Sequence, residues 1–91
     1  DVHDLVAARF GGFNGIIQVI SRHLVQYFEN IENVFISDAG VERITFDAFQ
    51  RCGNIREIAV VNNQITSLHN GLFRNCNNLM RLDFRSNWIE A

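Results

Sequence analysis

The stretch I-R-E-I-A-V-V-N-N-Q-I, residues 55–65, decides the fold of this chain. Apolar and other side chains alternate from Ile58 to Val60, a pattern typical of a short strand that buries one face. Asn63 and Ile65 then complete the spacing L-x-x-L-x-L-x-x-N-x-L, with aliphatic residues in the leucine positions. This spacing predicts one unit of a repeat protein, and such a protein must contain further copies of the unit at a fixed spacing.

Copies of the same pattern lie 24 residues before and after this stretch. The earlier copy begins at Ile31 and the later one at Leu79. The agreement extends beyond the strand, because three further pairs of residues recur at the same spacing: Phe49 and Phe73, Cys52 and Cys76, Asn54 and Asn78. The chain is therefore predicted to be a single repeat segment, residues 1–91, with units at 31–54 and 55–78 and a partial unit at 79–91.

A degenerate unit is predicted upstream, at residues 7–30. Phe10, Ile17 and Ile20 occupy expected columns, whereas Gly12 and Gly15 fill two columns poorly. The apolar residues of this unit also follow helical i, i+4 spacing, so Ile17–Phe28 is predicted to form a helix, whereas later units are expected to return through one helical turn each.

The pattern resembles the leucine-rich-repeat family over residues 7–91, specifically its extracellular class with 24-residue units and Phe in the loop half. The run from Phe49 to Ile55, repeated from Phe73 to Leu79, is further similar to insect secreted members, including mosquito leucine-rich-repeat immune proteins. The resemblance implies an α/β solenoid: an arc with a parallel sheet on its concave face and short helical or irregular convex returns. It also implies an extracellular or secreted protein.

Composition restricts the function classes. The chain is 47% hydrophobic and 20% charged, with a net charge of -2, which argues against a disordered chain and against nucleic acid as a partner. No window approaches the length of apolar sequence that spans a membrane, so membrane insertion is not expected.

A protein-binding surface is predicted on the outward side of the strands. At 24-residue spacing the outward columns read Arg9, Asn33, Glu57, Arg81; Gly11, Phe35, Ala59, Asp83; and Phe13, Ser37, Val61, Arg85. Exposed apolar residues beside charged ones suit protein recognition. The predicted partner-binding residues are Phe13, Phe35, Glu57, Val61, Arg81, Asp83 and Arg85, and the alternative is that an irregular first unit covers the apolar ones.

A second surface is predicted at the open edge of the repeats. Trp88 and Ile89 come near the end of the sequence, in the middle of a unit, where an apolar edge needs a cover. The chain is expected to be a fragment of a longer ectodomain, or else to associate with itself through this edge.

The two cysteines allow two alternatives. Cys52 and Cys76 occupy an apolar column, which predicts buried free thiols, with a disulfide between neighbouring coils as the alternative. A disulfide would indicate an oxidising compartment.

The sequence contains no pattern that predicts a metal site or a catalytic site. His3, His23 and His69 fall in different columns without zinc-site spacing. Asp1-Val2-His3 could bind Cu²⁺ or Ni²⁺ in square-planar geometry if Asp1 is a true amino terminus. The more economical interpretation is that the tripeptide matches this motif by chance. A Cys76 nucleophile with His69 as its base was rejected because the thiol was expected to face the core. No enzyme activity, cofactor or metal is therefore expected.

The sequence as a whole predicts a module that binds a protein partner through its concave strands, with a role in innate immunity implied by the insect resemblance. The alternative is a structural or adhesive module that assembles through open repeat edges.

Overall fold

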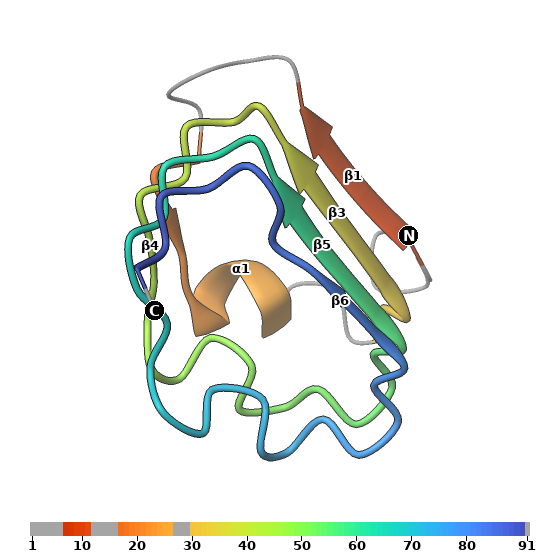
Figure 1. Ribbon diagram of the computed structural model, residues 1–91. Coiled ribbons are helices and arrows are strands. Elements are labelled where there is room, and N and C mark those ends of the chain that lie inside the picture. Colours follow the sequence, from red (N-terminus) through yellow and green to blue (C-terminus); the bar gives the residue numbers. More distant parts are fainter. Residues whose placement is uncertain (1–6, 12–16, 27–29, 91) are drawn as a thin grey trace.

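The computed structural model describes residues 7–11, 17–26 and 30–90, and for residues 7–11 it describes the backbone. The chain winds into coils that stack on one another, so that segments one repeat apart lie side by side (Figure 1). This arrangement is a repeat, solenoid-like fold.

Two parallel sheets form two sides of the stack. The larger sheet has the strand order β1-β3-β5-β6, with strands Ala7–Gly11, Asn33–Ser37, Glu57–Val61 and Arg81–Asp83. The smaller sheet pairs β2 (Val19–Ile20) with β4 (Arg43–Ile44). One short helix, α1 (Arg22–Gln26), follows β2 on the return side. The predicted parallel sheet is thus confirmed, while the curvature of an arc stays a prediction.

The strand register confirms the 24-residue spacing in most of the stack and corrects it at the first strand. Glu57 pairs with Asn33 on one side and with Arg81 on the other. On β1, however, Arg9 pairs with Phe35 rather than with Asn33, so the predicted first column was wrong by two residues.

The two extra residues lie between β1 and β2, since Ile20 still pairs with Ile44 at the 24-residue spacing. Alanine and glycine dominate β1, and they mark the inward face of a strand too weakly for the sequence alone to reveal the shift.

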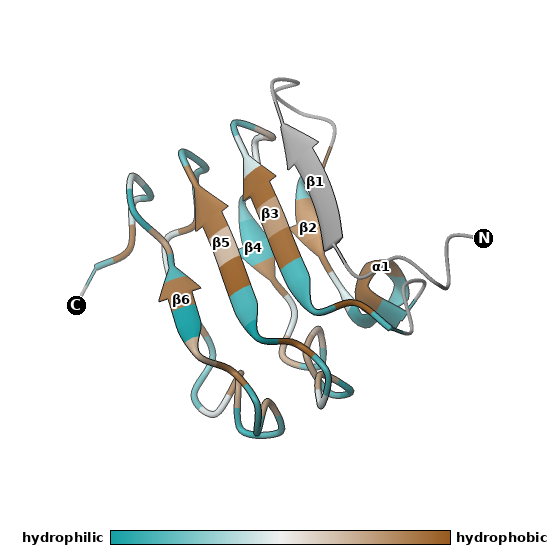
Figure 2. Ribbon diagram, turned by 90° about the vertical axis from the view of Figure 1, so that its right-hand side faces the viewer, coloured by the Kyte–Doolittle hydropathy of each residue, from teal (hydrophilic) through white to brown (hydrophobic). Residues whose placement is uncertain are grey.

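Alternate residues of the strands fill the core. Val34, Ile36, Ile58 and Val60 are buried, whereas the residues between them are partly exposed. Figure 2 shows apolar sequence along β3 and β5, with hydrophilic residues where these strands begin. Full burial of an aliphatic side chain contributes about 1.5 to 3 kcal/mol, so these strand residues supply much of the driving force for stacking.

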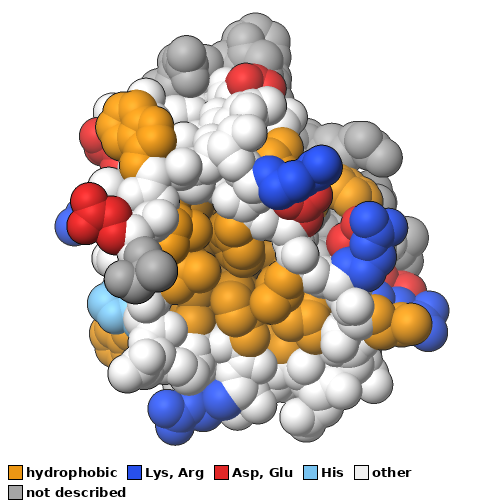
Figure 3. Space-filling model, viewed as in Figure 1, with side chains coloured by type: hydrophobic (Ala, Val, Ile, Leu, Met, Phe, Trp, Pro, Cys, Tyr) orange, Lys and Arg blue, Asp and Glu red, His pale blue; other side chains and the backbone are white. Residues whose placement is uncertain are grey.

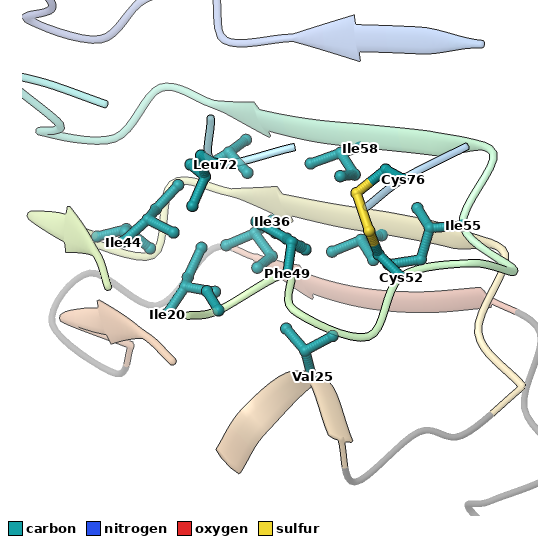
Figure 4. Packing of buried hydrophobic residues seen from close by; sticks show 14 of the residues in the cluster. Ile20, Val25, Ile36, Ile44, Phe49, Cys52, Ile55, Ile58, Leu72 and Cys76 are labelled. Atoms are coloured by element: carbon teal, nitrogen blue, oxygen red, sulfur yellow. A yellow bond between two sulfur atoms is a disulfide. The ribbon is translucent and has the colours of Figure 1, made fainter. Parts of the chain in front are cut away.

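Aromatic rings extend across the core from the return side to the end of β6. The centroids of the Phe49 and Phe73 rings lie 5.4 Å apart, and those of Phe73 and Phe84, the residue after β6, lie 5.9 Å apart. Val25 is buried in the same cluster and approaches it from α1 (Figure 4). The repeated phenylalanines of successive units, Phe49 and Phe73, are therefore packed against each other.

A left-handed residue shapes the bend after β3, β5 and β6, and an asparagine follows it after β5 and β6. Asp38, Asn62 and Ser86 occupy equivalent positions and have φ values of 52°, 54° and 59°. Asn63 is buried, and its side chain accepts hydrogen bonds from the backbone N–H groups of Ala39 and Val41, both at 3.1 Å. Asn87 is half-buried and repeats the role one coil later, because such side chains satisfy backbone groups that the bend removes from water.

The return segments contain less helix than the sequence predicted. Val19 and Ile20 form a strand because they pair with β4, so the helix predicted from Ile17 begins at Arg22 and spans five residues. The end of that prediction, residues 27–28, lies outside the described residues. Later returns are single turns, in which Ala48 donates to the Thr45 carbonyl at 3.1 Å and Leu72 donates to the His69 carbonyl at 3.2 Å.

A disulfide joins Cys52 and Cys76, so the preference for free thiols was wrong. The column is buried as predicted, but stacking brings the two Cα atoms to 4.9 Å, well within the separation that a disulfide allows (Figure 4). The bond links two successive coils on the return side.

Candidate functional site: the outer face of the large sheet

The candidate site consists of side chains on the outer surface of β3, β5 and β6, which we call the strand face. Its members are the outward residues of these strands and Arg85, which lies two residues after β6 and just before the bend: Asn33, Phe35, Ser37, Glu57, Ala59, Val61, Arg81, Asp83 and Arg85. Alternation along each strand places them on one surface because their neighbours point into the core.

The apolar part of the strand face lies on β3 and β5. Phe35, Ala59 and Val61 are each partly exposed, between the buried residues of the same strands. Phe35 and Ala59 are paired directly across the two strands, and Ser37 is paired with Val61. The apolar surface is therefore continuous from one coil to the next.

The charged part lies on β5 and β6. Arg81 Nη1 lies 3.7 Å from Glu57 Oε2, and Arg85 Nη2 lies 2.9 Å from Asp83 Oδ2. The Asp83 carboxylate also accepts hydrogen bonds from Arg85 Nε and from the Arg85 backbone N–H.

These contacts determine the protonation of Asp83. The side-chain hydrogen bond from Arg85 is the largest influence that lowers the pKa of the Asp83 carboxyl, and the backbone hydrogen bond from Arg85 lowers it further. The contact with Arg85 therefore favours the carboxylate form of Asp83.

Six of the seven predicted partner-binding residues lie together on this face. Phe35 and Val61 belong to the apolar part, and Glu57, Arg81, Asp83 and Arg85 belong to the charged part. Phe13 lies outside the described residues, so its predicted place on the face is untested.

The predicted edge residues lie on the last described coil. The side chains of Leu82 and Trp88 are 48% and 62% exposed, whereas Ile58, the equivalent of Leu82 in the preceding coil, is fully buried. Figure 3 views the stack from this end and shows hydrophobic side chains gathered around a hollow in its centre. The coil that contains β6 thus exposes the kind of surface that inner coils bury against each other.

The structure bears differently on the catalytic and metal sites that the sequence raised. Cys76 cannot act as a thiolate nucleophile while it is bonded to Cys52. Asp1 and His3 lie outside the described residues. Among the residues that the structure describes, no cluster of three His, Cys, Asp or Glu residues could hold a metal ion.

Sequence reasoning missed one hollow. His23 and His69, predicted to be scattered, both line it, together with residues around β4. Ser21, Thr45 and His69 share one column of the repeat, but His23 and Arg43 belong to other columns, so the spacing alone did not reveal the hollow. In the described part of the chain, no helix has the length and apolar character needed to cross a membrane.

Comparisons with known proteins support the repeat assignment. Residues 13–91 match the family described as the BspA type leucine-rich repeat region (6 copies). The comparison with curated proteins gave no match. The match does not support the narrower resemblance to insect immune proteins. Because it covers most of the sequence, and because the structure shows stacked coils in which Asn63 and Asn87 bond the backbone of the coil before them, the chain belongs to the BspA-type leucine-rich-repeat family.

Proposed function

We propose that this chain is a recognition module that binds a protein partner through the strand face. The observation that carries the proposal is the division of one sheet surface into an apolar part, around Phe35 and Val61, and a charged part, around Arg81 and Asp83. Protein interfaces combine an apolar centre with a polar rim in this way. The family assignment supports the proposal, because leucine-rich repeats generally mediate binding between proteins.

Site-specific photo-crosslinking tests the proposal. A photoreactive amino acid replaces Ala59, in the centre of the strand face, or Asn77, an exposed turn residue on the return side, and each protein is irradiated in an extract of its native cells. The proposal predicts a discrete protein adduct from position 59 and none of that mass from position 77. Adducts of the same kind from both positions would contradict it.

Competition then links the adduct to the named side chains. Excess unlabelled protein should suppress the adduct, whereas the double variant Phe35→Glu and Val61→Glu should not. The matched control is the double variant Gln50→Glu and Asn77→Glu, which adds the same two negative charges at exposed residues of the return side and should compete fully. Circular dichroism of both variants shows whether the fold persists. If the strand-face variant is folded and competes fully, the strand face is not the binding surface.

We also propose an extracellular location. The support is the Cys52–Cys76 disulfide, because such bonds persist in oxidising compartments and are rare in the cytosol of mesophiles. Fractionation of the native cells tests this proposal, which predicts the oxidised chain outside the cytosol. A role in innate immunity, implied by the insect resemblance, gains no support from the family match and forms no part of the proposal.

A second candidate function is assembly through the apolar end of the stack. It is favoured by the exposure of Leu82, Trp88 and Ile89 on one coil. Light scattering coupled to size exclusion, over a range of concentrations, compares the mass in solution with the 10.5 kDa of the chain. Assembly predicts a multimer that dissociates when Leu82 and Ile89 are both replaced by Glu, whereas recognition through the strand face predicts no dependence on these residues.

A further inference from the structure

A hollow of about 430 Å³ opens where β4 meets the return segments, on a different side of the coil from the strand face. Three successive coils contribute to it, and its volume falls within the range of small-molecule sites. Residues that matter for its chemistry are Arg22, His23, Arg43, Phe46, Asp47 and His69.

Positive charge exceeds negative charge in this hollow. Among its described lining residues Asp47 is the one carboxylate, and two groups already bind it: the Thr45 hydroxyl donates to Oδ1 at 2.7 Å, and Arg22 Nε lies 3.7 Å from Oδ2. Within the described part of the chain, no carboxylate lies within 4.0 Å of the Arg43 guanidinium. The Arg43 side chain therefore has its hydrogen-bond donors available to a ligand.

An exposed aromatic ring stands at the rim. The Phe46 side chain is 76% exposed, and it also lines a neighbouring hollow of about 260 Å³ that Arg74 and Asn75 border. An apolar ring that separates two polar hollows offers a flat surface to the hydrocarbon part of a ligand. The residues 24 positions before and after Phe46 are Arg22 and Asn70, which are both polar. The repeat pattern of the core therefore does not require an aromatic residue at this position.

We propose that this hollow binds an organic oxyanion, with the carboxylate, sulfate or phosphate group held by Arg43 and the organic part packed against Phe46. Arginine suits this role because its planar guanidinium donates two parallel hydrogen bonds to such groups. The imidazoles of His23 and His69 supply further donors at the wall of the hollow, and Arg22 keeps Asp47 from repelling the anion.

Ligand titration followed by NMR tests the proposal, with the ring resonances of His23 and His69 as reporters. The probes are inorganic sulfate, phenyl sulfate, phenyl phosphate and benzoate, at constant ionic strength. We expect saturable shifts of both rings with the phenyl compounds and weaker binding of inorganic sulfate. The rank order of the three phenyl compounds identifies which anionic group the site prefers.

Three single variants separate a built site from general attraction of anions. Arg43→Gln should weaken the binding of the preferred phenyl compound about three- to tenfold, the effect of one exposed ionic contact. Phe46→Ser should reduce the affinity for phenyl sulfate to that for inorganic sulfate. Arg51→Gln, an exposed arginine outside the hollow, should leave binding unchanged.

Two results would overturn the proposal. One is the absence of any ring shift with all four probes at millimolar concentration. The other is an equal loss of affinity in Arg43→Gln and Arg51→Gln, which would show that net charge alone attracts the anion. Each substituted side chain is exposed, and Phe46→Ser provides a second reading if Arg43→Gln alters the fold.

Discussion

Asn63 donates a hydrogen bond from Nδ2 to the carbonyl oxygen of Ile36 at 3.1 Å, across 27 residues of sequence. The same amide accepts the N–H groups of Ala39 and Val41, so one side chain satisfies three backbone groups of the preceding coil. Asn87 donates to the Val60 carbonyl at 2.7 Å in the next coil. These contacts connect each coil to the one before it where the backbone leaves the sheet.

Replacing Asn63 by Ala should therefore destabilise the fold by about 2 to 4 kcal/mol, because it leaves buried backbone donors and an acceptor without partners. Asn77→Ala, at an exposed turn position, should change the free energy of unfolding by less than about 0.5 kcal/mol. Urea denaturation followed by circular dichroism measures both. Equal stability of the two variants would refute the role assigned to Asn63.

Removing the disulfide should lower stability by about 3 kcal/mol, since it closes a loop of one repeat in the unfolded chain. The double variant Cys52→Ala and Cys76→Ala should unfold at lower urea concentration than the oxidised protein. Addition of a reductant should destabilise the parent protein but leave the variant unchanged. Two free thiols in the mass spectrum of the air-oxidised, folded protein would be the contrary result.

Substitution by Ala should destabilise the fold more at Gly71 than at Gly53. Gly71 has a φ of 69°, and a Cβ at this residue would lie 2.6 Å from the Arg74 guanidinium, whereas a Cβ at Gly53 meets nothing within 4 Å. We expect Gly71→Ala to cost about 1 kcal/mol, because the flexible Arg74 can move but the backbone strain remains. Gly53→Ala should be neutral or slightly stabilising, and thermal unfolding of both variants tests the difference.

The pKa of Asp83 should depend on Arg85. Since Arg85 lowers the pKa of this carboxyl in the folded chain, Arg85→Gln should raise it toward its ordinary value, whereas Arg51→Gln should not. The lowered pKa means that the contact stabilises the folded chain above the unfolded-state pKa of Asp83, and that this contribution is lost as the pH falls through the folded-state value. NMR titration of the Asp83 carboxyl carbon measures the shift, and an unchanged pKa in Arg85→Gln would exclude the contact.

The repeat made most of the fold predictable. Once Ile31, Ile55 and Leu79 are aligned, alternation assigns the inward and outward residues of β3, β5 and β6, and these assignments agree with the register. The spacing also places Asn63 and Asn87 at equivalent bends, where each side chain bonds backbone groups of the coil before it.

The predictions from the sequence were wrong where the repeat pattern is weak, and where the pattern gives the position of a residue but not its bonding state. The alanines and glycine of β1 left its shift of two residues undetected. Apolar spacing from Ile17 fitted a helix as well as a strand followed by a helix, and pairing with β4 decided between them. The Cys52 column was correctly buried, but only the distance between coils could distinguish a disulfide from two thiols.

The strand face could be predicted because its residues fall in the outward columns of the repeat, whereas the hollow beside β4 could not. His23 and Arg43 reach that hollow from neighbouring coils at different positions in the repeat, so their approach depends on the path of the return segments. Side chains that meet across columns leave no periodic signal in a single sequence.

The most direct test of recognition through the strand face is an NMR titration of the chain with the partner that photo-crosslinking identifies, followed by mapping of the backbone amide shifts. We predict that the largest shifts occur on β3, β5 and β6, at Phe35, Ala59 and Val61 and at the neighbouring Asp83. Shifts confined to the return turns, or to Trp88 and Ile89 at the end of the stack, would contradict the proposed function.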